Sequence, residues 1–347
     1  MEYTQLREML SALCPLPGPS GFERPVALKA AELLEPLVDE VNIDRMGNVI
    51  GVRRCGIPNA KSILLDAHLD EIGLIIIGSE EGFLRFRSIG GVDPRMLPNR
   101  EVTILTEPPL FGVVACLPPH VLQAGEADKA IPLEELYIDT GLTQDQVEEM
   151  IPAGTPCVFR DGCFALGTQQ MCGKSMDDRA CFVTLLRAAQ MLQEKNLDVD
   201  LYIMGSTREE VSHGGAAAGT WAIAPDCCIA VDVTHGKTPD SPKYRTNDLG
   251  GGPSIGVGPN MTRWMTERMF AKAKDNGIPF QYDVMAGATG TNGWDMQIAR
   301  EGIATHVLSL PLKYMHSPVE TLDLADVENV AALIAAFIDG LGSEALA

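Results

Sequence analysis

The segment LLDAHLDEIGLI, residues 64–75, begins as an apolar strand but places a histidine among carboxylates. Acidic and histidine residues recur in short clusters along the chain, at Asp66, His68, Asp70 and Glu71, Asp177 and Asp178, Glu209 and Glu210, Asp232, and His316. Acids that converge in one place repel one another, so such a site requires cations. Imidazole and carboxylate suit zinc, cobalt or manganese, and the sequence lacks the cysteine cluster of a closed structural zinc site. We therefore predict a catalytic site with two divalent metal ions.

The spacing within these clusters indicates different roles. Asp70 lies two residues from His68, on the same side of an extended chain, where it can accept a hydrogen bond from the imidazole nitrogen that binds no metal. Asp177, at the start of a predicted helix, can offer both carboxylate oxygens. Glu209 and Glu210 are adjacent, so their side chains diverge. One of them can bind a metal while the other acts as a general base, as metal-assisted hydrolysis requires.

The remaining histidines and the glycine-rich segments have simpler interpretations. We interpret His120, His213 and His306 as loop or strand histidines with satisfied hydrogen bonds, although His213 follows the glutamate pair. His235 could support a metal ligand. The segments GPSGFE and LGGGPSIGVG lack the spacing of a phosphate-binding loop and indicate turns.

The polar clusters follow strand-like segments of one kind. SILLDAH, DLYIMGSTREE, CCIAVDVTH and THVLSLPLKYMH are each a short apolar run that turns polar at its C-terminal end. Helical periodicity appears between them, in ACFVTLLRAAQMLQE, GGAAAGTWAIA and WMTERMFAKAKDNG, and in two further segments near the N-terminus. Strands interleaved with helices predict an α/β sheet, whose ligands bind outside the carboxyl ends of the strands.

Residues 73–165 do not follow this alternation. REVTILT, LFGVVACL and TPCVFRDGCFAL are short strands separated by Gly and Pro, with one predicted helix at TQDQVEEMI. This pattern is typical of a small β-barrel or sandwich. Because the α/β alternation continues on both sides, we predict a discontinuous catalytic domain, residues 1–72 and 166–347, that is interrupted by a β-domain at 73–165.

Composition excludes several classes of partner. The 347 residues include 47 acidic and 27 basic side chains, and the net charge of −20 opposes binding to nucleic acid and to anionic membranes. The nine cysteines are an odd number without a C-x-x-C pair, which indicates reduced thiols and a cytoplasmic protein. No apolar run approaches the ~20 residues of a membrane span, and the N-terminus lacks the pattern of a signal peptide.

Taken together, these motifs resemble those of the dinuclear-metal aminopeptidases of the tetrahedral (TET) family. This family is glutamyl aminopeptidase-like and includes proteins once labelled endoglucanase M. The similarity covers nearly the whole chain, through PGPSGFE, AHLDEIG, GGVDPRMLP, GVVACLPPH, YIDTG, KSMDDRA, EEVSHGGA, AVDVTH, GGGPSIG and KYMHSPVE.

The resemblance implies an enzyme that removes N-terminal residues from peptides. It implies a phosphorylase/hydrolase-like mixed sheet flanked by helices, with an inserted small β-barrel-like domain for self-association, from a dimer to a tetrahedral dodecamer. It also implies two ions per subunit, zinc or cobalt with manganese as an alternative. The implied site consists of His68 and Asp232 on one metal, Glu210 and His316 on the other, Asp177 as the bridge and Glu209 as the general base.

Two further expectations follow from the resemblance. It implies a cis peptide bond between Asp177 and Asp178, which would turn Asp178 away from the metals as an outer partner. The chain also departs from the family's common pattern at two places near the site, at Ser212 and His213 and again at Trp294.

Three alternatives to the aminopeptidase remain open at this point. A related dinuclear deacylase or carboxypeptidase would use a similar site. A glycosidase needs two carboxylates and no metal ligands, so His68 and His316 argue against it. A non-catalytic assembly protein would not need an intact Glu209.

Overall fold

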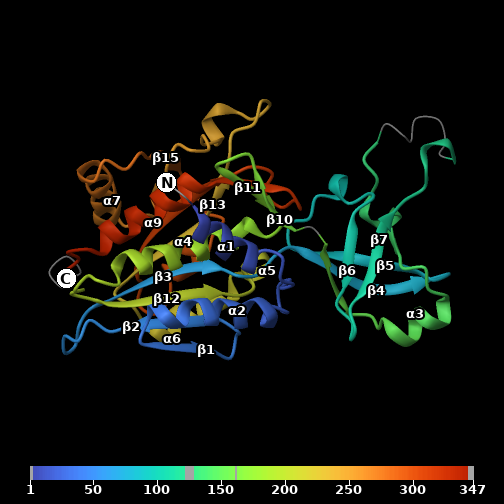
Figure 1. The fold of residues 1–347 in the computed structure, drawn as a ribbon, viewed down its shortest axis with the longest axis horizontal. Helices are drawn as coiled ribbons and strands as arrows, with labels where there is room; N and C mark the ends of the chain where they lie inside the picture. The colour runs from blue at the N-terminus through green and yellow to red at the C-terminus, as the bar shows by residue number, and fades with distance from the viewer. Residues whose placement is uncertain (1–2, 122–128, 161, 343–347) are drawn as a thin grey trace.

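The computed structural model describes residues 3–121, 129–160 and 162–342. Two units lie side by side: a large unit in which helices cover a sheet, and a smaller barrel of strands (Figure 1). The chain leaves the large unit, forms the barrel and returns, so that the first and the last described helices, α1 and α9, both lie in the large unit. The predicted α/β fold with an inserted small β-barrel is confirmed.

The secondary-structure elements have the following bounds. The strands are β1 Glu40–Ile43, β2 Val49–Arg53, β3 Ser62–His68, β4 Gly73–Glu80, β5 Phe83–Ile89, β6 Glu101–Ile104, β7 Leu110–Ala115, β8 Tyr137–Asp139, β9 Pro156–Phe159, β10 Cys163–Leu166, β11 Gln170–Gly173, β12 Asp200–Ser206, β13 Cys227–His235, β14 Ser254–Val257, β15 Gln281–Val284, β16 Ala304–Leu312 and β17 Glu320–Asp323. The helices are α1 Thr4–Leu13, α2 Arg24–Leu34, α3 Gln144–Met150, α4 Met176–Leu192, α5 Glu209–Ser212, α6 Gly214–Ile223, α7 Arg263–Asp275, α8 Gly293–Met296 and α9 Leu324–Ile338. Short 3-10 turns are η1 Glu35–Leu37, η2 Pro94–Met96, η3 Pro119–Val121, η4 Leu133–Glu135 and η5 Lys243–Arg245.

An eight-stranded mixed sheet forms the centre of the large unit, in the order β1-β2-β12-β3-β13-β16-β14-β15. Its four central strands, β12, β3, β13 and β16, are parallel to one another and correspond to the four apolar segments of the sequence. β2 and β14 join antiparallel on either side. The carboxyl ends of the four parallel strands therefore lie at one edge of the sheet.

Side chains of the central strands alternate between two apolar cores. Ile63 and Leu65 of β3 pack in the core that α1, α2, α4, α7 and α9 cover. Leu64 packs on the other side, in a core to which α6 and α8 contribute. A sheet that is covered on both faces selects continuous apolar strands, which explains the four uninterrupted runs. Among the described residues, no helix combines the length and apolarity that crossing a membrane requires.

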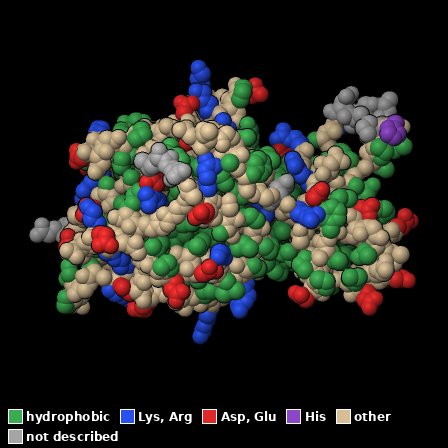
Figure 2. All heavy atoms as spheres, viewed as in Figure 1, with side chains coloured by type: hydrophobic (Ala, Val, Ile, Leu, Met, Phe, Trp, Pro, Cys, Tyr) green, Lys and Arg blue, Asp and Glu red, His purple; other side chains and the backbone are tan. Residues whose placement is uncertain are grey.

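The barrel is closed by β4, β5, β8, β7, β6 and β9 around a separate apolar core. The predicted helix α3 begins with a capping box, in which Thr143 and Gln146 exchange hydrogen bonds between side chain and main chain. β10 does not belong to the barrel, because it pairs with β11 in a three-stranded sheet that β17 completes. On the face shown in Figure 2, acidic side chains lie along the outer rim of the barrel.

Candidate active site

The carboxyl ends of the central strands bring the predicted polar clusters together. His68 is the last residue of β3, and Asp232 lies near the end of β13. Glu209 and Glu210 open α5, shortly after β12, and His316 follows β16. These side chains come from distant parts of the sequence, and they meet because parallel strands end at the same edge of a sheet.

Asp177 lies between two histidines. Its Oδ1 is 3.1 Å from Nε2 of His68, and its Oδ2 is 3.3 Å from Nε2 of His316. Each carboxylate oxygen therefore faces a different imidazole, which is the arrangement that a bridging carboxylate needs. The residue precedes the regular turns of α4, and the peptide bond between Asp177 and Asp178 is cis, as the resemblance implies.

Two groups of side chains are close enough to share a cation. In one group, ligand atoms of His68, Asp178 and Asp232 lie within 4.8 Å of one another, and in the other group those of His68, Asp177 and Glu210 do. Oδ2 of Asp178 accepts the main-chain N–H of His68 at 3.2 Å, whereas its buried Oδ1 has no hydrogen-bond partner among the described residues. These side chains fit divalent ions, whose charge would compensate the buried carboxylates.

The electrostatics of the cluster also favour the binding of cations. Burial raises the pKa of Asp232 and of Glu210 well above the usual range, and neighbouring carboxylates add to the effect. Burial also acts to raise the pKa of Asp177, but hydrogen bonds with His316 and His68 outweigh it and lower that pKa below the usual range. A buried cluster in which carboxylates cannot all ionise is the environment that bound cations stabilise.

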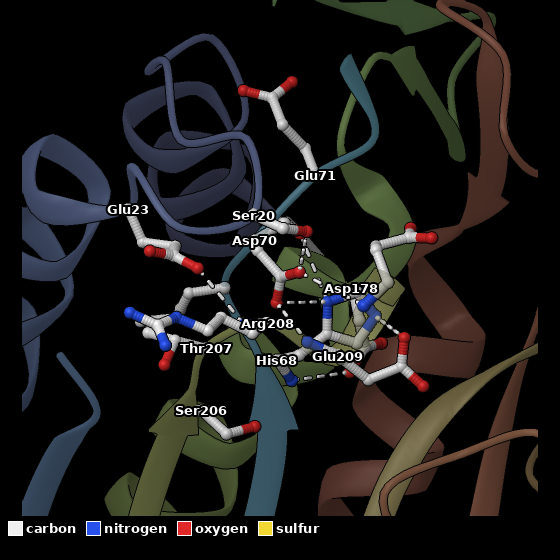
Figure 3. A network of polar contacts seen from close by, with 12 residues as sticks. Ser20, Glu23, His68, Asp70, Glu71, Asp178, Ser206, Thr207, Arg208 and Glu209 are labelled. Carbon is white, nitrogen blue, oxygen red and sulfur yellow. Dashed lines mark hydrogen bonds and ion pairs between the residues drawn. The ribbon is translucent and has the colours of Figure 1, made fainter. Parts of the chain in front are cut away.

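Asp70 organises the two glutamates, and Figure 3 shows it beside Glu209 and Ser20. Its Oδ1 accepts the main-chain N–H of Glu209 at 3.0 Å, and its Oδ2 accepts the main-chain N–H of Glu210 at 3.2 Å and the hydroxyl of Ser20 at 2.6 Å. Nδ1 of His68 lies 3.2 Å from the main-chain oxygen of Asp70 and 3.5 Å from its carboxylate. Asp70 thus contacts the imidazole chiefly through its main chain, and its carboxylate aligns the glutamate pair.

The other carboxylates near His68 support the scaffold. Glu71 points away from His68 in Figure 3 and forms buried ion pairs with Lys174 at 2.6 Å and Arg179 at 3.2 Å. Asp66 accepts a hydrogen bond from the amide of Asn292 at 2.7 Å. The carboxylates around His68 therefore have separate functions, and Asp70 is the one that holds the glutamate pair.

Glu320 is a site residue that sequence reasoning missed. Its side chain is only 2% exposed, and its Oε2 accepts the main-chain N–H of Asp177 at 3.1 Å. Its Oε1 accepts the main-chain N–H of His316 at 2.8 Å. Glu320 therefore holds the main chain of both Asp177, the candidate bridge, and His316. The signal in the sequence is an acid four residues after His316, at the end of the segment KYMHSPVE.

His213 is a loop histidine with satisfied hydrogen bonds, as predicted, but both of its partners are carboxylates at the site. Nε2 of His213 lies 3.2 Å from Oε1 of Glu209, and Nδ1 lies 2.6 Å from Oδ2 of Asp295. Hydrogen bonding to Glu209, which outweighs partial burial, raises the pKa of His213 to about 9. Asp295 was missed because it belongs to α8, which is 82 residues away in the chain.

The remaining histidines have different surroundings. His306 lies in β16 as a strand histidine, but it is buried and neither ring nitrogen has a hydrogen-bond partner among the described residues, so the prediction of satisfied hydrogen bonds is wrong. His120 is exposed in η3. His235 lines the cavity at the site.

The site opens into a cavity of about 950 Å³. Its lining includes Asp177, Glu209, Glu210, Asp232 and His316. The rest of the wall comes mainly from the segments 233–235, 243–247 and 282–291, together with Gly91, His213, Ser309 and Met315. A volume of this size is at the upper end of pockets that hold small ligands.

A buried cluster of histidines and carboxylates at the carboxyl ends of parallel strands, open to such a cavity, is the site of a metal-dependent hydrolase. The match to a family model then identifies the kind of hydrolase. The chain belongs to the M42 glutamyl aminopeptidase family, whose model matches residues 47–333.

Individual relatives are similar over almost their whole length. The lysyl aminopeptidase of Pyrococcus furiosus is 35% identical, over 96% of this chain and 97% of its own. The structure of aminopeptidase APDkam598 from Desulfurococcus kamchatkensis is 36% identical with a TM-score of 0.91, over 99% of this chain and 97% of that one. The TET1 peptidase of Pyrococcus horikoshii, which can assemble into a tetrahedron or a large octahedral shell, is 31% identical with a TM-score of 0.84, over 97% of this chain and 100% of that one.

Family membership establishes the activity. The protein is a metal-dependent aminopeptidase, and therefore a hydrolase and a protease. The deacylase or carboxypeptidase, glycosidase and non-catalytic alternatives are not favoured.

Proposed function

We propose that the protein removes N-terminal residues from peptides with the help of two divalent ions per subunit. The observation that carries this proposal is the carboxylate of Asp177, whose two oxygens face His68 and His316 at 3.1 and 3.3 Å. We assign His68 and Asp232 to one ion, Glu210 and His316 to the other, and Asp177 to both.

We assign the role of general base to Glu209, which does not bind a metal in this scheme. When bound, the ions supply Lewis-acid polarisation of the scissile carbonyl and of the attacking water. Glu209 takes the proton of that water and passes it to the leaving amine. Asp70 holds the main chain of Glu209 in place through the hydrogen bond at 3.0 Å. The carboxylate of Glu320 accepts the main-chain N–H of Asp177, and the carboxylate of Asp178 accepts the main-chain N–H of His68. Both contacts hold a proposed ligand in place.

The donor set supports zinc or cobalt as the ions, with manganese as the alternative. The assigned ligands are imidazole nitrogens and carboxylate oxygens, which suit these three metals. Cysteine does not belong to the described cluster around Asp177, so the softest metals are disfavoured.

The experiment separates the base from the ligands. We expect a chelator to abolish hydrolysis of aminoacyl-nitroanilides, and added zinc or cobalt to restore it. We expect Glu209→Gln to lower kcat by about 10²- to 10⁴-fold while both ions remain bound, because a general base contributes about that much. Metal content measured by mass spectrometry provides the second readout. Glu149→Gln, an exposed change in α3, is the matched control. Loss of the ions from Glu209→Gln would contradict the division between Glu209 and Glu210.

We also propose that the β-domain, residues 73–165, supports self-association of the catalytic domain formed by residues 1–72 and 166–347. The assembly of the TET1 relative and the separate core of the barrel support this proposal. Deletion of 73–165 should reduce the number of subunits per particle, obtained from the mass measured by light scattering and the mass of the shortened chain, and an unchanged number of subunits would contradict the proposal. The deletion also removes Gly91, whose main-chain oxygen lies 3.0 Å from Nδ1 of His316, so activity is not a suitable readout for this test.

We place the enzyme in the cytoplasm, with peptides as its substrates and neither nucleic acid nor membranes as partners. All nine cysteines are free, which supports a reducing compartment. The net charge of −20 opposes binding to phosphate backbones and anionic lipid.

A further inference from the structure

His213 lies between two carboxylates that come from different elements. Its Nε2 is 3.2 Å from Oε1 of Glu209, and its Nδ1 is 2.6 Å from Oδ2 of Asp295. The residue has a left-handed backbone, with φ of 52°, at the junction of α5 and α6. Its main-chain N–H donates to the oxygen of Glu209 at 3.3 Å, and its main-chain oxygen accepts from Ala217 at 3.0 Å. Both the main chain and the ring of His213 are therefore held.

Both ring nitrogens of His213 act as donors in this arrangement. A carboxylate accepts hydrogen bonds only, so Glu209 and Asp295 each require a proton on the imidazole nitrogen that faces them. The resulting hydrogen bonds are charge-assisted, and such bonds are shorter and stronger than neutral ones. The pKa of His213, which is raised to about 9, keeps both protons in place at neutral pH.

The contact leaves the two oxygens of Glu209 in different situations. Oε1 is occupied by His213, whereas Oε2 lies 3.7 Å from Nε2 of His68, on the side of the proposed metal ligands. A carboxylate that is anchored through one oxygen cannot rotate freely and presents the other oxygen in a constant direction. Small displacements of a reacting group cost large factors in rate.

We propose that His213, anchored by Asp295, is a positioning residue that directs Oε2 of Glu209 toward the attacking water. This proposal rests on the general-base role proposed above for Glu209. His213 acts through Glu209, so its removal should change the chemical step and leave the metals and the binding of substrate largely unaffected.

The test compares variants of the metal-loaded enzyme on an aminoacyl-nitroanilide. His213→Leu should lower kcat by about 10- to 100-fold, the usual cost of losing such a supporting partner, with KM within about twofold of the wild type. His213→Gln should recover part of the loss, because its amide can still donate to Glu209. Asp295→Asn should cause a smaller loss, since the amide oxygen can still accept from Nδ1. His120→Leu, an exposed change in η3, should match the wild type.

A double-mutant cycle distinguishes positioning from a general structural effect. Glu209→Asp keeps a carboxylate but withdraws it from His213 by one methylene, so adding His213→Leu to it should cost much less than in the wild type. An unchanged kcat in His213→Leu, or losses that multiply fully in the double variant, would overturn the proposal. If His213→Leu loses metal or unfolds, His213→Gln and Asp295→Asn decide the question by the same criteria. A metal-loaded wild type without aminopeptidase activity would instead overturn the proposed function.

Discussion

The barrel and the catalytic edge of the large unit bury different kinds of side chain. Within residues 73–121 and 129–160, no polar or charged residue is buried as a whole, although the hydroxyl of Thr140 is, and the ion pairs of the barrel, such as Arg87 with Glu134, are exposed. At the catalytic edge, His68, Asp70 and Asp178 are almost completely buried. The barrel is thus stabilised by apolar packing, whereas the site requires charges that only partners or bound ions make tolerable.

The difference shows that this chain buries charged side chains, which is energetically unfavourable, at the catalytic edge and not in the barrel. Barrel strands need only alternate apolar and polar side chains, and their core could be rebuilt with other apolar residues. At the catalytic edge, neighbouring side chains hold the functional residues by hydrogen bonds: Glu320 accepts from the main chain of Asp177, and Ser20 donates to Asp70. Substitutions in the two regions should therefore have different consequences for stability and for metal content.

The largest expected difference concerns two ion pairs of nearly equal length. Glu71 lies 2.6 Å from Lys174 in the buried network, and Glu134 lies 2.7 Å from Arg87 on the surface of the barrel. Glu71→Gln should lower the free energy of unfolding by about 3–5 kcal/mol, because it leaves buried cations unpaired. Glu134→Gln should produce no measurable change.

Urea unfolding of the two variants measures this difference. Equal losses of stability in both variants would show that burial does not distinguish the regions. A third variant, Lys174→Met together with Glu71→Leu, should recover part of the loss, because apolar replacement of a buried pair is often neutral.

The next effect is a pH dependence of stability in the large unit. Burial lowers the pKa of His306 to about 4, whereas an unfolded histidine titrates near 6.5. Between these values the unfolded chain binds more protons than the folded one, so stability is lost as the pH falls from about 6.5 toward 4. Between pH 7 and pH 5 the wild type should lose about 2 kcal/mol more than His306→Leu.

Both proteins are compared with the chelator present throughout, so that release of metals does not contribute. Parallel curves of unfolding free energy against pH would show that His306 is not responsible. The barrel offers no equivalent, since its described histidine, His120, is exposed.

The smallest effect tests whether the barrel core is independent of the site. Ile138 of β8 is fully buried in the barrel, and Ile203 of β12 is fully buried in the large unit. Ile138→Val and Ile203→Val should each cost about 0.5–1.5 kcal/mol of stability. Ile138→Val should leave the bound metal unchanged in equilibrium dialysis. Release of metal from this variant would show that the two regions are coupled.

The sequence by itself determined the framework of this protein. Four apolar runs that end in polar residues predicted the four parallel central strands, because burial on both faces of a sheet imposes continuous apolar segments. His68 and Asp232 lie where two of these runs turn polar, and ligands of an α/β sheet bind at the carboxyl ends of its strands, so their place at the site could also be predicted. The break in the alternation after residue 72 predicted the barrel, since closely spaced turns exclude the crossovers that parallel strands need.

Only the tertiary structure decided which neighbouring residue does what. Asp70 and Glu71 are adjacent and chemically similar, yet one holds the glutamate pair and the other belongs to a buried ion network. Two departures from the common family pattern, at His213 and near Trp294, are separate in the sequence, but packing of α6 against α8 brings His213 and Asp295 into contact. Strand and helix patterns are set by local periodicity, whereas these contacts depend on how distant elements pack, which no local pattern records.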